Sequence, residues 1–126
     1  MIEYARWTGI SGQAYNFEVF RDGVEFNPVS GVYILSKVAT ASTGLRRFEA
    51  LYVGEAQSLK DRLNASAINH DGLKRSRQSG MTHIAVYRCD GAAERLRIET
   101  DLRHALDPVC NRQSVPSLAG LFTTRR

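Results

Sequence analysis

The sequence predicts an α/β domain: a small central sheet of three antiparallel or mixed strands, flanked by helices and extended by an N-terminal β-hairpin. Two observations favour this class. Short segments rich in β-branched and aromatic residues alternate with amphipathic segments. The chain has 126 residues, 43% of them hydrophobic, which is enough for one core. A single domain is therefore expected over residues 1–126.

The N-terminal hairpin is expected at about residues 12–28. Residues 14–20 alternate apolar and polar side chains in part, which is typical of a half-buried strand. The sequence Arg21-Asp22-Gly23 provides a turn signal before a return strand at residues 24–26, and Pro28 ends the pairing.

The central strands are expected at residues 31–38, 48–53 and 82–87. The first two are joined by a polar loop at residues 39–47, and segments so close in sequence pair naturally as an antiparallel hairpin.

Three helices are predicted, at residues 56–65, 70–79 and 92–106. The first carries a capping-box pattern, with Ser58 as the cap and Asp61 three residues later. The third places apolar residues on one face at helical spacing, and a proline two residues after its end stops it.

The charge and the cysteine content of the sequence limit the kinds of binding partner and metal site that are expected. The net charge of +4 and the pI near 9.4 fit a partner made of phosphates, although many other proteins share such values. Cys89 and Cys110 are too few for a disulfide framework and lack the spacing of a zinc site. No stretch resembles a signal peptide or the run of about 20 apolar residues that crosses a membrane, so a cytoplasmic location and no membrane partner are expected.

Five groups of residues stand in an order that carries more information than any one of them. They are Gly31-Val32-Tyr33, Tyr52-Val53-Gly54, Arg62, Glu99 and Asn111. The first triplet opens a strand, the second closes the next strand, and the arginine follows the second tyrosine by ten positions on the next helix. The glutamate lies in the middle of the third helix, and the asparagine follows its stop.

This set resembles the GIY-YIG nuclease domain over about residues 31–111, roughly two-thirds of the chain. The sequence departs from the family pattern in having valine for isoleucine in both triplets and a longer gap between Tyr33 and Tyr52. Neither change removes a polar group that hydrolysis of a phosphodiester needs. The N-terminal hairpin lies outside the resemblance.

The resemblance implies a metal-dependent endonuclease that hydrolyses phosphodiester bonds in DNA, with one Mg²⁺ or Mn²⁺ held by Glu99. It implies that Tyr33 is the general base or a relay to it, and that Tyr52 hydrogen-bonds the attacking water or the phosphate. Arg62 would pair with a phosphate oxygen. Asn111 would order the wall of the site through hydrogen bonds.

Each residue also has an ordinary structural interpretation. The tyrosines fit core aromatics of strands, Glu99 fits a solvated helix residue, and Asn111 fits a helix-exit turn. His70 is either a base beside Tyr33 or a loop residue.

A basic group beside the expected site is predicted to contact nucleic-acid phosphates without reading sequence. It consists of Lys60, Lys74, Arg75 and Arg77. The alternative functions are a catalytically inactive nucleic-acid-binding module on the same fold and a protein-interaction domain. The sequence leaves open the oligomeric state, the biological pathway, and whether the DNA is single- or double-stranded.

Overall fold

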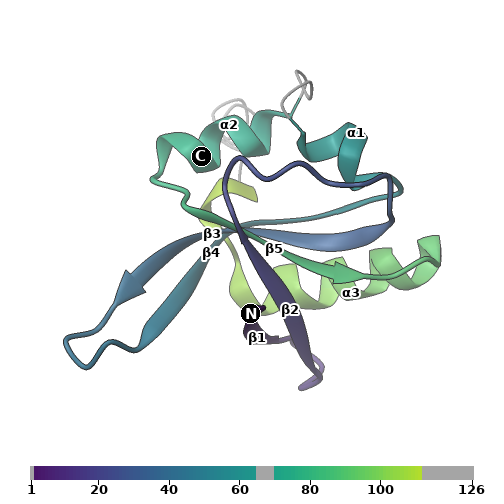
Figure 1. Ribbon diagram of the computed structural model, residues 1–126. Coiled ribbons are helices and arrows are strands. Elements are labelled where there is room, and N and C mark those ends of the chain that lie inside the picture. The colour runs from purple at the N-terminus through teal and green to yellow at the C-terminus, as the bar shows by residue number, and fades with distance from the viewer. Residues whose placement is uncertain (1, 65–69, 112–126) are drawn as a thin grey trace, which may run out of the picture.

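The computed structural model describes residues 2–64 and 70–111. Its strands are β1 (Glu3–Thr8), β2 (Ala14–Arg21), β3 (Gly31–Thr40), β4 (Arg46–Ala56) and β5 (His83–Arg88). Its helices are α1 (Leu59–Leu63), α2 (Asp71–Gln78) and α3 (Ala92–Leu106), followed by the 3₁₀ turn η1 (Val109–Asn111). The α/β class is confirmed, with α1 and α2 on one face of the sheet and α3 on the other (Figure 1). None of the helices in the described ranges is long and apolar enough to cross a membrane.

The sheet has five strands in the order β1-β2-β5-β3-β4, all antiparallel to their neighbours, so the prediction of three strands was too low. The difference arises because β2 pairs with β5, with Glu18 opposite Val86 and Arg21 opposite His83. The N-terminal hairpin is therefore part of the main sheet rather than an appendage.

The predicted hairpin at residues 12–28 was wrong in its pairing. The hairpin joins β1 to β2, and its turn contains Gly12 at a φ of 90°, a conformation that glycine adopts readily. The expected return strand at residues 24–26 does not form. Instead, the Asn64 side chain accepts a hydrogen bond from the Phe26 N–H at 2.7 Å and donates one to its carbonyl at 3.0 Å.

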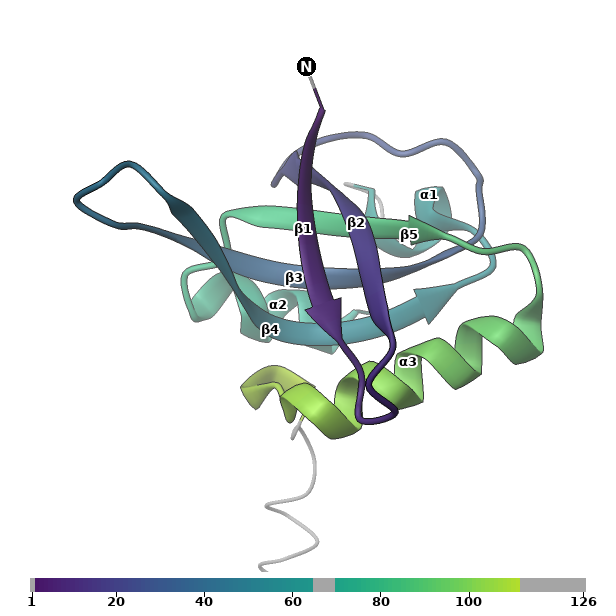
Figure 2. The same cartoon turned by 90° about the horizontal axis from the view of Figure 1, so that it is seen from below.

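Asp101 of α3 clamps the turn of this hairpin to the helix through hydrogen bonds. The β1–β2 turn lies close to α3 (Figure 2). The Asp101 carboxylate accepts hydrogen bonds from the Ser11 N–H, the Ser11 hydroxyl and the buried Tyr15 hydroxyl, each at 2.8 Å. Gly9 is required beside it, because a Cβ there would lie 2.0 Å from an Asp101 oxygen.

Replacing Asp101 with alanine is expected to lower the free energy of unfolding by about 2–4 kcal/mol, because the buried Tyr15 hydroxyl loses its partner. Urea unfolding followed by circular dichroism measures this loss. Glu94→Ala on the same helix is the control, since its ion pair with Arg97 is exposed and contributes little to stability. Equal losses in the two variants would contradict the clamp.

Two apolar clusters fill the two faces of the sheet. The cluster beneath α1 and α2 contains Tyr33, Leu35 and Leu51, and the cluster beneath α3 contains Phe17, Val53 and Leu102. The clusters therefore fix each layer of helices over its own face of the sheet.

A bulge in β4 changes which way its side chains point. Leu35 pairs with Tyr52 but Ser36 pairs with Ala50, so Leu51 is the extra residue. Strict alternation would send Leu51 and Tyr52 to opposite faces, yet both pack against the cluster beneath α1 and α2. The bulge thus directs Tyr52 towards the helices that carry the remaining candidate residues.

The strand continues past its predicted end at Val53 as far as Ala56, so the prediction that α1 begins at Ala56 was wrong. Ser58 caps α1 as expected, accepting a hydrogen bond from the Asp61 N–H at 3.3 Å. Ala65, the predicted last residue of this helix, lies outside the described ranges.

Candidate active site

A cleft of about 260 Å³ lies at the outer edge of β4, the last strand of the sheet, between α1 and α2 on one side and α3 on the other. Its lining residues are Tyr52, Arg62, Asp71, Gly72, Arg75, Glu99, Arg103 and Asn111. Four of the six predicted catalytic residues are among them. The other two, Tyr33 and His70, do not line the cleft; they are buried and pack against Tyr52.

The rings of Tyr33, Tyr52 and His70 form one cluster of contacting aromatic rings at this edge. The two phenol rings are nearly parallel with centroids 6.1 Å apart, and the imidazole lies edge-on to both, at 5.8 and 5.3 Å. Tyr33 is 1% exposed, whereas Tyr52 is only partly buried and reaches the cleft. The structure therefore places Tyr52 on the wall of the cleft and Tyr33 beneath it.

Two glycines make room for these rings. A Cβ on Gly54 would lie 2.5 Å from the Tyr33 hydroxyl oxygen, and a Cβ on Gly72 would lie 2.4 Å from the Tyr52 ring. Both distances are far below van der Waals contact, so any larger residue would displace a phenol. The second triplet therefore needs its glycine for space around Tyr33 rather than for a turn.

His70 has both ring nitrogens engaged. Its Nδ1 accepts a hydrogen bond from the Leu73 N–H at 3.1 Å and so caps the N-terminus of α2, while its Nε2 lies 2.6 Å from the Tyr33 oxygen. Burial, together with the charges of Arg62 and Arg75, lowers the pKa of His70 to about 4, so the ring is neutral at pH 7. Because Nδ1 accepts, the single proton of the neutral ring is on Nε2, which donates to the Tyr33 oxygen. His70 in this state holds Tyr33 and cannot take its proton.

Because the buried His70 is neutral, the stability of the folded protein depends on pH. The pKa of His70 is about 4 in the folded protein and about 6.5 in the unfolded chain, so the unfolded chain binds more protons between these values. The contribution of His70 is complete above pH 6.5 and falls by up to about 3 kcal/mol as the pH drops to 4.

Comparison with His70→Asn isolates this effect, because asparagine can still cap α2. Unfolding in urea between pH 4 and 7 is expected to show a steeper loss of stability in the wild type than in the variant. His83 also has a pKa lowered by burial and by Arg46, but both proteins retain it. Parallel curves would contradict the neutral, capping His70.

Arg62 of α1 lies beside both phenols. Burial and the neighbouring Tyr52 raise the pKa of Tyr33, and Arg62 opposes that rise. Burial alone would lower the pKa of Arg62, but the oxygens of Tyr33 and Tyr52 outweigh it, and the pKa lies above its usual value. A permanently charged guanidinium at this point supplies donors suited to a phosphate oxygen.

Glu99 is 9% exposed and reaches the cleft from α3. Burial raises its pKa, and Glu55 adds to the rise while Arg103 opposes it. The contacts of its carboxylate are long, at 3.5 Å from the Thr100 hydroxyl and 3.7 Å from Arg103. Its oxygens are thus available to a further ligand.

Glu99 is the candidate ligand for a hard divalent cation in the cleft. Within residues 2–64 and 70–111, no three His, Cys, Asp or Glu side chains gather at one point. One buried carboxylate with weakly engaged oxygens can hold Mg²⁺ or Mn²⁺ when waters and a phosphate oxygen complete the shell.

Asn111 and Arg75 build the wall of the cleft. The Asn111 amide accepts a hydrogen bond from the Val53 N–H at 2.8 Å and donates one to its carbonyl at 2.9 Å. Arg75 donates two hydrogen bonds to the Cys110 carbonyl, at 3.1 and 2.7 Å. Together they hold η1 against β4 and α2.

The predicted nucleic-acid-binding residues are not equivalent. Arg75 lines the cleft, but two of its donors are used on the Cys110 carbonyl. Arg77 is paired with Asp22 at 3.0 Å outside it. Lys60 and Lys74 are exposed and do not line the cleft. The structure thus brings only Arg75 of this group to the cleft.

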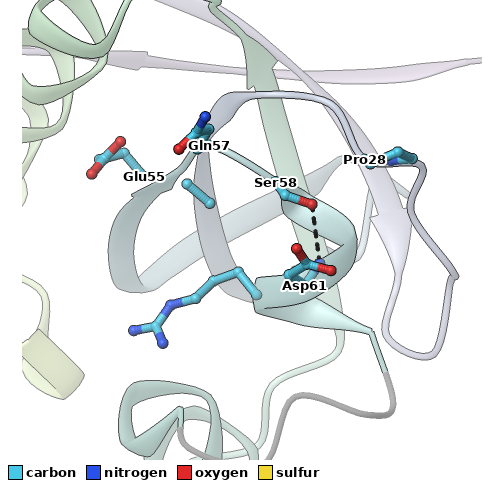
Figure 3. Close-up of a pocket in the computed structure, with 7 residues that line it drawn as sticks. Pro28, Glu55, Gln57, Ser58 and Asp61 are labelled. Atoms are coloured by element: carbon cyan, nitrogen blue, oxygen red, sulfur yellow. Dashed lines mark hydrogen bonds between the residues drawn. The ribbon is translucent and has the colours of Figure 1, made fainter.

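A second, more open groove of about 710 Å³ lies beside Glu55, Gln57 and Ser58 (Figure 3) and shares Arg62 with the cleft. It is lined by Pro28, Glu55, Ala56, Gln57, Ser58, Asp61 and Arg62. Glu55 on its rim pairs with the buried Arg95 at 2.9 Å. Arg62 therefore borders both hollows.

Sequence reasoning missed Asp71, Gly72 and Arg103 as cleft residues. A signal existed only for Arg103, which follows Glu99 by four positions and so shares its helix face. Comparisons of the chain with protein-family models, curated proteins and solved structures return no match. The functional proposal therefore rests on the cleft itself.

Proposed function

We propose that the protein is a metal-dependent endonuclease of the GIY-YIG type that hydrolyses phosphodiester bonds in DNA. One observation carries the proposal: Tyr52, Arg62 and Glu99 come from three separate elements and line one cleft. Tyr33 and His70 lie directly behind the first of them. Such convergence of a cation, an available carboxylate and a pair of phenols suits phosphodiester hydrolysis.

The charge of the cleft favours a phosphate. Its lining has three arginines against two carboxylates, Asp71 and Glu99, and therefore a net positive charge. Arg62 binds a non-bridging oxygen of the scissile phosphate and stabilises the charge that develops on it.

The phenols handle the proton of the attacking water. Tyr52, on the cleft wall, orients the water by a hydrogen bond, and Tyr33, whose ring stacks against that of Tyr52, is the acceptor of the proton in this proposal. Tyr33 accepts the proton as the phenolate, which forms once the phenol has lost its own proton to solvent; because burial raises its pKa, this form is scarce at neutral pH. The Nε2–H of His70 and the guanidinium of Arg62 both stabilise that form against the effect of burial.

Glu99 would hold the divalent cation, which when bound supplies Lewis acidity at the phosphate oxygens and the leaving group. Asn111 keeps Val53 and the adjoining Tyr52 in place through its paired hydrogen bonds. The free thiols Cys89 and Cys110 fit a reducing compartment, so we propose that the reaction takes place in the cytoplasm.

Incubation of the purified protein with plasmid and with single-stranded DNA, in Mg²⁺ or in EDTA, tests the proposal. Cleavage is expected in Mg²⁺ and absent in EDTA and in Glu99→Ala. If wild type and variant are equally inactive on every substrate, the nuclease proposal fails. Equal binding of DNA by these two inactive proteins would then favour the nucleic-acid-binding module.

A further inference from the structure

We propose that Arg103 binds a second phosphate of the DNA, adjacent to the scissile phosphate at Arg62. The inference rests on the proposed nuclease function and names a residue that the sequence did not single out. Arg103 lies on α3 and Arg62 on α1, which cover opposite faces of the sheet, and both line the cleft at the edge of β4. A phosphodiester backbone that crosses this edge therefore meets one guanidinium on each side.

The donors of Arg103 are available. The guanidinium of Arg103 forms an ion pair with Glu99 at 3.7 Å, which is too long for a hydrogen bond. The other arginines of the cleft are more committed, since Arg75 donates twice to the Cys110 carbonyl and Arg62 lies against two phenols. A side chain that is 43% exposed and held by one long ion pair can follow a bound strand.

Glu99 provides the reason why Arg103 is held over the cleft. The two residues are one helical turn apart, so the carboxylate attracts the guanidinium while no other cation is present. A divalent cation at Glu99 would neutralise that carboxylate and release Arg103 to the phosphate. Occupation of Glu99 and binding of the second phosphate are thereby linked.

Binding of DNA in a background that cannot cleave tests this role. Glu99→Gln is combined either with Arg103→Met or with Arg97→Met, the matched control, whose ion pair with Glu94 lies on the same helix. We expect the Arg103 variant to bind a short oligonucleotide about tenfold more weakly than Glu99→Gln. The slope of log affinity against log salt concentration should also be shallower, by about the amount that one phosphate contact contributes. The Arg97 variant is expected to match Glu99→Gln.

Oligonucleotides with one neutral methylphosphonate at successive positions then locate the contact. A methylphosphonate at one position beside the scissile phosphate is expected to weaken DNA binding by Glu99→Gln and to leave DNA binding by the Arg103 variant unchanged. Equal binding by the Arg103 and Arg97 variants, or the absence of such a position, would overturn this inference alone. If Glu99→Gln and the wild type both fail to bind DNA, and the wild type does not cleave it, the proposed function fails as well.

Discussion

Replacing Glu99 with glutamine is expected to reduce cleavage by about a thousandfold, because the cation that we propose at Glu99 would supply several kcal/mol of stabilisation to the transition state. The protein itself is expected to become no less stable. Burial raises the pKa of Glu99, so the folded state binds the proton more tightly than the unfolded chain, and stability is lost as the pH rises through the folded value. Glutamine removes that loss, keeps an oxygen that can accept from the Thr100 hydroxyl, and gives up a long ion pair with the half-exposed Arg103.

The measurement combines cleavage rates in Mg²⁺ with urea unfolding at pH 8. Glu94→Gln, an exposed position on the same helix, should leave the cleavage rate unchanged. A Glu99→Gln protein that cleaves within tenfold of the wild type would show that Glu99 holds no catalytic cation. A large drop in its stability would instead mark Glu99 as a structural residue.

Replacing Arg62 with alanine is expected to lower kcat by about 10²–10³-fold, the usual cost of one donor to a developing oxyanion. Its loss also removes the charge that opposes the raised pKa of Tyr33. Arg62→Lys should recover part of the loss, since lysine keeps the charge but not the planar pair of donors.

Lys60→Ala is the control, as it removes an exposed cation from the same helix outside the cleft. Single-turnover rates at saturating DNA separate binding from chemistry. An Arg62→Ala protein that changes only KM would confine the arginine to binding of substrate. Equal effects of the two alanine variants would leave no specific role for Arg62.

The cleft could be predicted in part because its residues belong to a pattern with fixed spacing. Tyr52, Arg62 and Glu99 do reach one place, as a strand end, a following helix and a later helix can all meet at one sheet edge. The burial of Tyr33 beneath Tyr52 could not be predicted, since it depends on a bulge at Leu51 and on the space left by Gly72. These are properties of packing between distant segments.

The errors in the predicted fold also arise from packing between segments that are distant in sequence. The turn signal at Asp22-Gly23 is real, since Gly23 has a φ of 104°, but the chain beyond it does not return as a strand. The place of β2 in the sheet depends on its pairing with β5 and on the hydrogen bonds from the β1–β2 turn to Asp101. Both partners lie far away in sequence. Local propensity predicts that a strand exists but not its neighbour.

The amide of Asn111 has a consequence for how copies of this protein meet. An edge strand presents unpaired N–H and C=O groups, and another chain can add to them as an extra strand. At Val53 of β4 the asparagine side chain already occupies both groups. One amide therefore takes the place of a partner residue at this point of the edge, and a second chain cannot pair with Val53 without displacing it.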